Sequence, residues 1–277
     1  MDRLSELMKT TPSAQWYSDD PMEIQRRYAA RCNSVPGNLN EQDGIDCPIC
    51  MNRGLIYRAE EGTGNLLSRE CVCKKKRREA AQRANSNAPA DTSVKTFDTY
   101  RTQEPWQAGI KQSAIAFTDG YAKGAESWFF LGGQPGSGKT HIAKAIYNVM
   151  LQTGAQVVYM SWKEDAGYLK ALLNTDGYKP MTDRYKRAEV LFIDDFLKTR
   201  READGTYRMP TDGDMNLAFE IIKHRDENNL VTVITSEFTV DGICSFDQST
   251  GGRIRQRSGA YCLAIRPDAA KDYRRAL

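Results

Sequence analysis

The sequence predicts an α/β fold in which helices cover a parallel five-stranded sheet, preceded by a small cysteine-rich module. Three observations lead to this prediction. Short continuous apolar runs alternate with amphipathic helical segments in the C-terminal two thirds of the chain. A glycine-rich loop joins the first of these runs to the first helix, and four of the seven cysteines fall between residues 47 and 73.

The overall composition is that of an ordinary globular protein. The chain has 277 residues, 40% of them apolar and 27% charged, with a net charge of +3. It contains no apolar run of the 18 residues that a membrane helix needs, and its first ten residues lack the apolar core of a signal peptide. We therefore expect a cytoplasmic protein without a membrane partner. The weak positive charge permits contact with nucleic acid without indicating it.

The N-terminal part contains the cysteine cluster. Residues 1 to about 30 are predicted to be helical, and the stretch 31–46, rich in Asn, Gly and Pro, is predicted to be a loop. Two closely spaced pairs follow, Cys47 and Cys50, then Cys71 and Cys73. In a reducing compartment such a cluster favours a metal over disulfides, and four thiolates complete a tetrahedral structural Zn²⁺ site. The short spacing of the second pair leaves open that Cys32 replaces one ligand.

A charged helix and a linker are predicted to follow the last cysteine. The basic run 74–78 is interpreted as a solvated helix face in preference to a nucleic-acid contact. Residues 84–94 are small and polar and include a proline, a composition typical of a linker. The predicted organisation is therefore a helical, zinc-binding domain at 1–83, a linker at 84–94 and a larger domain at 95–277.

The larger domain shows the alternation of strands and helices. An amphipathic pattern predicts a helix over His141–Leu151, and Met215, Ala218, Phe219 and Ile222 repeat the helical spacing. Continuous apolar strands separated by helices indicate a parallel sheet buried on both faces. The five predicted strands are Trp128–Leu131, Val157–Met160, Val190–Ile193, Val231–Ile234 and Tyr261–Ile265.

The loop after the first strand matches the phosphate-binding pattern G-x-x-x-x-G-K-[ST]. Its glycines allow backbone N–H groups to surround phosphate oxygens, and the following helix directs its positive end at them. Lys139 is expected to contact the β- and γ-phosphates, and Thr140 to ligate Mg²⁺. The loop comprises Gly133, Gln134, Pro135, Gly136, Ser137, Gly138, Lys139 and Thr140, and His141 follows it as a further cofactor-binding candidate.

A pair of carboxylates ends the third predicted strand. Asp194 is expected to hold Mg²⁺, and Asp195 to orient the water that attacks ATP. The alternative is that the two aspartates are simply solvated at the end of a strand. The neighbouring phosphate loop favours the catalytic interpretation.

These features resemble the AAA+ family and, within it, the DnaC/DnaI helicase loaders. The resemblance covers roughly residues 95–277. Several segments, in their order along the chain, narrow it from AAA+ proteins in general to the helicase loaders. They are Thr96-Phe97-Asp98, GQPGSGKTH, LFIDDF, FEIIKHR ending at Arg225, VTVITSE, GGRIRQR and Asp272-Tyr273-Arg274.

The resemblance implies further roles in an ATPase whose sites are shared between subunits of a homo-oligomer. Glu237 occupies the position of the γ-phosphate sensor, where the family carries Asn. A glutamate would repel phosphate unless a water or a cation intervenes, so Ser236 is the alternative. Arg253 corresponds to the arginine finger, with Arg255 and Arg257 as alternatives.

Three other features of the C-terminal half are interpreted through the same resemblance. Arg274 corresponds to the second sensor, with Arg275 beside it. Arg225 either faces the subunit boundary or ends a helix in solvent. The chain stops at Leu277, which leaves no room for the C-terminal helical lid of many AAA+ proteins, and loaders lack that lid.

The implied function is the ATP-dependent loading of a hexameric replicative DNA helicase onto single-stranded DNA, in a bacterium or a phage. The zinc module would bind the helicase, and Trp162, Lys163 and Lys170 would contact DNA unless the tryptophan belongs to the core. The implied cofactors are ATP, Mg²⁺ and Zn²⁺. Two alternatives remain: an IstB-like transposition ATPase, and an adaptor that senses ATP but hydrolyses it poorly.

Overall fold

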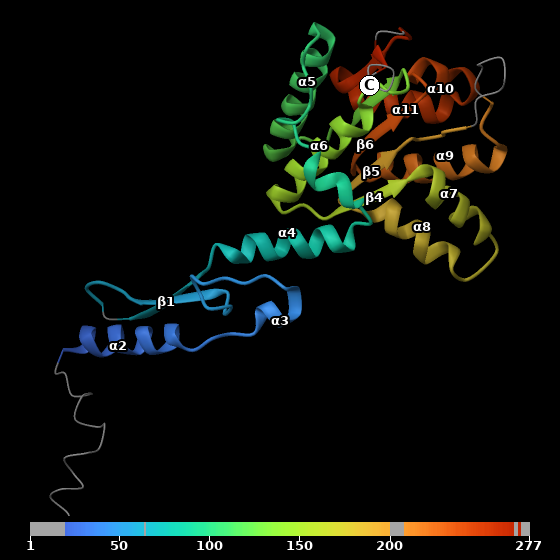
Figure 1. The fold of residues 1–277 in the computed structure, drawn as a ribbon. Helices are drawn as coiled ribbons and strands as arrows, with labels where there is room; N and C mark the ends of the chain where they lie inside the picture. The colour runs from blue at the N-terminus through green and yellow to red at the C-terminus, as the bar shows by residue number, and fades with distance from the viewer. Residues whose placement is uncertain (1–19, 64, 200–207, 269–270, 273–277) are drawn as a thin grey trace, which may run out of the picture. The chain divides into compact units, whose positions relative to one another are not determined.

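The fold is described from a computed structural model that covers residues 20–63, 65–199, 208–268 and 271–272 (Figure 1). The chain divides into two compact units, Met1–Ala81 and Gln82–Leu277. Within the described residues, every helix is too short or too polar to cross a membrane. Each unit is described by itself below.

The first unit is built around an antiparallel hairpin. Its elements are α2 (Pro21–Ser34), α3 (Leu39–Asp43), β1 (Leu55–Ala59), β2 (Leu66–Glu70) and the start of α4 (Cys73–Asn85). Asp20 caps α2 by accepting the N–H of Met22 at 2.9 Å. Asn33 joins α2 to the hairpin because its side chain bonds both the N–H and the C=O of Tyr57. Of the helical region predicted for residues 1 to about 30, residues 1–19 lie outside the described part of the chain. Helix α2 occupies the remainder and continues four residues into the predicted loop, which also contains α3.

The second unit contains the predicted five-stranded parallel sheet. The strands lie in the order β4-β5-β6-β3-β7, and all four neighbouring pairs are parallel. Each predicted apolar run falls on one of them. The strands are β3 (Phe129–Gly133), β4 (Val157–Ser161), β5 (Val190–Asp194), β6 (Val231–Ser236) and β7 (Cys262–Ile265).

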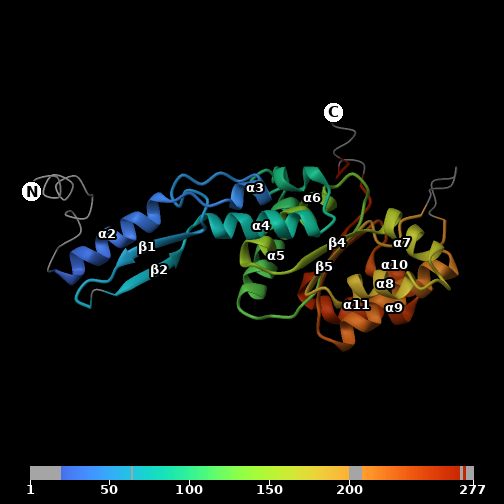
Figure 2. The same cartoon turned by 90° about the horizontal axis from the view of Figure 1, so that it is seen from below.

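Helices cover both faces of this sheet, as Figure 2 shows. Because strand side chains alternate between faces, Val190 and Phe192 join one apolar cluster, while Leu191 and Ile193 join the other. The first cluster includes α5 and α6, and the second includes the remaining α-helices. The helices of the first cluster are α5 (Pro105–Ala122) and α6 (Lys139–Thr153). Those of the second are α7 (Trp162–Ala171), α8 (Tyr178–Arg187), α9 (Asp212–Glu227), α10 (Val240–Phe246) and α11 (Gln248–Ser258).

The segment 84–94, predicted to be a linker, lies within the second unit and packs on its sheet and on α6. Ser86 is fully buried, and its carbonyl accepts the N–H of Tyr159 at 2.7 Å. The short 3₁₀ helix η2 (Ala90–Val94) lies on α6, where Asn148 donates to the carbonyl of Thr92 at 2.7 Å. Small residues suit close packing as well as linkers, and composition alone does not separate the two.

Arg225 is fully buried at the end of α9, which corrects both earlier interpretations of this residue. Its Nε donates to Thr232 Oγ1 at 2.9 Å, and its terminal nitrogens donate to the carbonyls of Val231, Tyr185, Lys186 and Ala188. Burial lowers the pKa of this guanidinium to about 9. Arg225 therefore joins the end of α8 to β6.

Replacing this arginine by methionine is expected to destabilise the second unit strongly. Arg225→Met leaves several buried carbonyls without a donor, which costs about 3–5 kcal/mol in total. The melting midpoint, measured by calorimetry, should fall by roughly 6 °C or more. The matched control is Arg187→Met at the exposed end of α8. A similar midpoint for both variants would contradict the structural role.

Candidate functional sites

The phosphate loop lies between β3 and α6 in a conformation that requires glycine. Gly133, Gly136 and Gly138 have φ values of 106°, 75° and 87°. A Cβ at Gly133 would lie 2.2 Å from the carbonyl oxygen of Ile265. One at Gly136 would lie 1.9 Å from Oδ1 of Asp272. The backbone is therefore closely confined, and the first turn of α6 directs its N–H groups to the loop, as anion binding requires.

Lys139 is buried within this loop. Its Nζ donates to the carbonyls of Gly133 and Gln134, at 2.8 Å each. Burial lowers the pKa of Lys139 to about 8, although Glu237, Asp195 and Asp194 act in the opposite direction. Neutral carbonyls hold this ammonium, so its charge is available to an anion.

Asp194 is held by hydroxyl groups from three directions. Thr140 donates to its Oδ1 at 3.1 Å, and Thr235 donates to the same oxygen. Tyr159 donates to Oδ2 at 2.7 Å. The structure thus brings Thr140 and Asp194 together, and a hydroxyl beside a carboxylate is the kind of oxygen ligand pair that Mg²⁺ prefers.

Asp195 and Glu237 meet at a lysine that the sequence analysis missed. Lys198 Nζ lies 2.7 Å from Asp195 Oδ2 and 3.2 Å from Glu237 Oε1. Its position three residues after Asp195 was the available signal. These side chains line one cavity together with Lys95, Pro135, Gly136, Gly138, Lys139, Thr140 and His141. Ser236, the alternative sensor, is fully buried and donates to the carbonyl of Phe196 instead.

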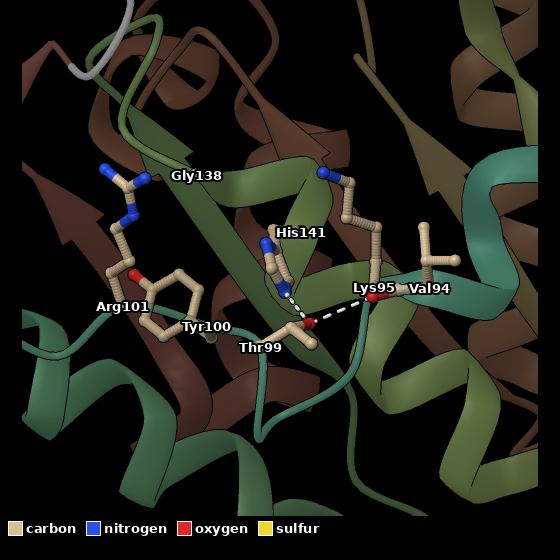
Figure 3. Close-up of a pocket in the computed structure, with 7 residues that line it drawn as sticks. All are labelled: Val94, Lys95, Thr99, Tyr100, Arg101, Gly138 and His141. Atoms are coloured by element: carbon tan, nitrogen blue, oxygen red, sulfur yellow. Dashed lines mark hydrogen bonds between the residues drawn. The ribbon is translucent and has the colours of Figure 1, made fainter. Parts of the chain in front are cut away.

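A second cavity adjoins the first at the start of α6 (Figure 3). His141 Nε2 lies 2.9 Å from the carbonyl oxygen of Thr96 and 3.1 Å from Thr99 Oγ1, and its ring packs edge-on against Tyr100. Burial lowers the pKa of His141. The lining residues are Val94, Lys95, Thr99, Tyr100, Arg101, Gly138 and His141. The two cavities share Lys95, Gly138 and His141 as lining residues.

The four cysteines of the first unit form a compact group. Their sulfur atoms all lie within 4.8 Å of one another, with Cys47 and Cys71 at 3.7 Å and Cys50 and Cys73 at 3.5 Å. Sulfurs bound to one Zn²⁺ at ~2.3 Å stand about 3.8 Å apart in a tetrahedron. The residues therefore fit this metal, and both members of the Cys-x-Cys pair belong to the group of four sulfurs. Cys32 lies outside the group.

The surroundings of the cysteines also suit a metal. Burial, which raises the pKa of a thiol, is outweighed at Cys50 by the N–H of Gly54 and by neighbouring thiols, so that pKa falls to about 6. Burial raises the pKa of Cys73 to about 12. Four thiolates so close together repel one another, and a bound cation is what permits them to coexist. Asn52 orients the first pair because it accepts the N–H of Cys47 at 2.7 Å.

A family model described as IstB-like ATP binding protein matches residues 57–248. The chain belongs to this family. The IstB-like protein has the AAA+ P-loop fold, and it is an ATPase with the parallel sheet, phosphate loop and strand-end carboxylates that the sequence predicts.

Three relatives place this IstB-like protein among known chains. It is 26% identical to the uncharacterized protein YqaM of Bacillus subtilis (strain 168), over 89% of this chain and 90% of YqaM. It is 32% identical to the phage-like element PBSX protein XkdC of the same organism, over 48% of each chain. The crystal structure of the DnaC helicase loader matches with a TM-score of 0.50 and 20% identity. That match covers 65% of this chain and all of the other, and it shows a shared fold.

The predicted arginine finger of the IstB-like protein lies outside its own nucleotide cavity. Arg253 is on α11, where its Nε lies 3.4 Å from Asp226 Oδ2 and its guanidinium covers the ring of Phe219. Arg255 pairs with Asp241, and Arg257 lies 3.8 Å from Asp226 Oδ1. Arg274 and Arg275 are outside the described residues. A residue that acts on a neighbouring subunit has to lie away from its own cavity, so the role of Arg253 stays a prediction.

The predicted DNA-contacting set is not assembled in the IstB-like protein. Trp162 is buried in the core and packs edge-on against Phe196 with ring centres 4.9 Å apart. Lys170 pairs with Asp214, whereas Lys163 is exposed. Trp162 therefore belongs to the core, which was the plain alternative, and it cannot stack on a base.

Proposed function

We propose that this IstB-like ATPase loads a replicative DNA helicase onto single-stranded DNA. One observation carries the proposal: a single chain combines a P-loop ATP site with a separate unit organised around four cysteines. The shared fold with a helicase loader supports it. ATP binding and hydrolysis would control the assembly and release of the complex.

The surface of the cysteine unit supports a protein partner. Ile49 lies within the first cysteine pair and Val72 within the second. The exposed fraction of the residue is 62% for Ile49 and 74% for Val72. Met51 follows the first pair and is exposed as well. Exposed large apolar side chains that are grouped together mark interaction sites, and these three flank one cluster of cysteines. A helicase subunit is the partner that we assign to them.

The geometry described above supports the following proposed roles at the ATP site. Lys139 and the loop N–H groups would bind the phosphates, and Thr140 with Asp194 would hold Mg²⁺. This ion would neutralise charge on the β- and γ-phosphates. Asp195 would orient the attacking water, and Arg253 of a neighbouring subunit would stabilise charge on the γ-phosphate. The sites would then be complete only in a homo-oligomer.

The test is native mass spectrometry of the protein mixed with the replicative helicase of its host, with and without ATP. We expect a defined complex that retains zinc. The double variant Ile49→Ser/Val72→Ser should lose at least about 10-fold in affinity, because apolar anchors carry most of an interface's binding energy. The matched control is Ile115→Ser, which changes an exposed isoleucine on α5. Failure to form a complex under every nucleotide condition would reject the loader function.

A transposition ATPase of the IstB type is the second candidate, and the match to the IstB-like family model is the observation that keeps it. Such a protein would act with a transposase in place of a helicase. Native spectra with both partners separate the two functions, since only one of them should give a stable complex. An adaptor that senses ATP would instead show binding of ATP with very slow turnover, with or without single-stranded DNA.

A further inference from the structure

We propose that Lys198 supplies the positive charge that contacts the terminal phosphate of ATP. It would take the place of the uncharged side chain that the resemblance led us to expect at the end of β6. This inference rests on ATP binding at the site described above, and it names a residue to which no role was assigned.

Lys198 lies in the wall of the nucleotide cavity. It lines the same cavity as Gly136, Lys139 and Thr140, so its side chain faces the place where phosphates would bind. The side chain is 28% exposed, which leaves it accessible to a ligand in that cavity. Lys198 and Lys139 thus bring two ammonium groups to one cavity from different elements.

The local charges give the second argument. Asp195 and Glu237 both line the cavity, and without a cation both carboxylates would repel the phosphates. Lys198 contacts both carboxylates. A lysine ammonium has three N–H donors, so two bonds to these acids leave one for a phosphate oxygen. Glu237 would then position the ammonium of Lys198 and would not contact phosphate itself.

The backbone of the preceding turn supports the same role. Asp195 and Leu197 both have a φ of 56°, a conformation that residues other than glycine rarely adopt. The turn is held by the N–H of Phe196, which donates to the carbonyl of Thr235 at 2.7 Å. It directs Lys198 back to the cavity and to Asp195. Unfavourable backbone conformations of this kind concentrate at functional sites, because the surrounding structure has to maintain them.

The proposed contact predicts selectivity between nucleotides. Lys139 and the loop would bind the phosphates shared by ATP and ADP, whereas Lys198 would contact only the phosphate that ADP lacks. The substitution Lys198→Met removes the charge and keeps a side chain of similar length. It should weaken binding of a non-hydrolysable ATP analogue by about 10- to 100-fold, the usual loss for a hydrogen bond between charged groups. ADP affinity should change by less than about 3-fold.

The experiment is equilibrium titration of both nucleotides by calorimetry, with melting curves for each variant. Lys198→Arg should keep the preference for the ATP analogue, since it keeps the charge. The double variant Lys198→Met/Glu237→Asn removes the cation and the acid together and should recover part of the preference. It also tests the idea if the single variant does not fold. Lys223→Met is the control, because Lys223 pairs with Glu227 on α9 and does not line this cavity.

Two outcomes would overturn the proposal. One is an equal loss of affinity for ATP and ADP in Lys198→Met, and the other is no loss for either. Failure of the helicase-loading function would be seen separately, as absence of a helicase complex with an intact preference for ATP. The nucleotide titrations need no partner protein, so the two failures remain distinguishable.

Discussion

Lys139→Ala is expected to reduce ATP turnover by at least about 100-fold in kcat/KM, which corresponds to ~2.7 kcal/mol. The ammonium of Lys139 is buried and donates to two loop carbonyls. Its removal takes the positive charge away from the place where negative charge develops on the transferred phosphate. A phosphate-release assay at saturating Mg²⁺ measures the loss.

The control for this prediction is Lys144→Ala. Lys144 is also buried and lies on the same helix, but its Nζ pairs with Asp91, outside the nucleotide cavity. This variant should be less stable and still hydrolyse ATP within about 3-fold of the unchanged protein, because Lys144 does not line the nucleotide cavity. Equal turnover in Lys139→Ala and the unchanged protein would place hydrolysis elsewhere.

Removal of zinc is expected to unfold the first unit while ATP binding survives. Small metal-held units gain most of their folding free energy from the metal, roughly 10 kcal/mol or more for structural zinc. Cys50→Ser, or treatment with a strong chelator, should therefore make residues 20–81 sensitive to protease. Limited proteolysis followed by mass spectrometry locates the cuts, and nucleotide titration checks the second unit.

Cys32→Ser is the matched control for the zinc prediction. Cys32 is a thiol of the same unit that lies outside the group of four sulfurs. This variant should retain its zinc and its resistance to protease. A preparation of the unchanged protein that contains no zinc, or a Cys50→Ser variant that keeps its metal and its fold, would show that the cluster is not a zinc site.

The parts of the fold that the sequence predicted well are those with local signals. The phosphate loop is a continuous motif, and its glycines are needed for the local backbone conformation. Strand β5 is buried on both faces, so its sequence is an uninterrupted apolar run. The cysteine pairs were predictable for a similar reason, since zinc ligands follow short spacings. None of these signals depends on knowing which distant segments meet.

The features that the sequence analysis missed or misjudged depend on contacts between segments that are distant in the sequence. Lys198 gains its significance from Glu237, which stands at the end of another strand, and only the sheet order brings the two together. Arg225 is charged and ends a helix, so its sequence context indicates solvent, whereas carbonyls from α8 and β6 surround it. Trp162 opens a polar helix and nevertheless packs against Phe196.

The surroundings of Arg225 bear on how ionic-strength experiments with this protein should be interpreted. Its guanidinium is bonded by carbonyl and hydroxyl dipoles, and within the described residues no carboxylate hydrogen-bonds it. Dissolved ions screen exposed charges beyond a Debye length of about 8 Å at physiological salt, but they do not reach a buried group bonded in this way. In the loader proposed above, added salt would weaken contacts with DNA phosphates and leave α8 attached to β6. For such a loader, the slope of DNA affinity against salt would count phosphate contacts, without a contribution from partial unfolding at this position.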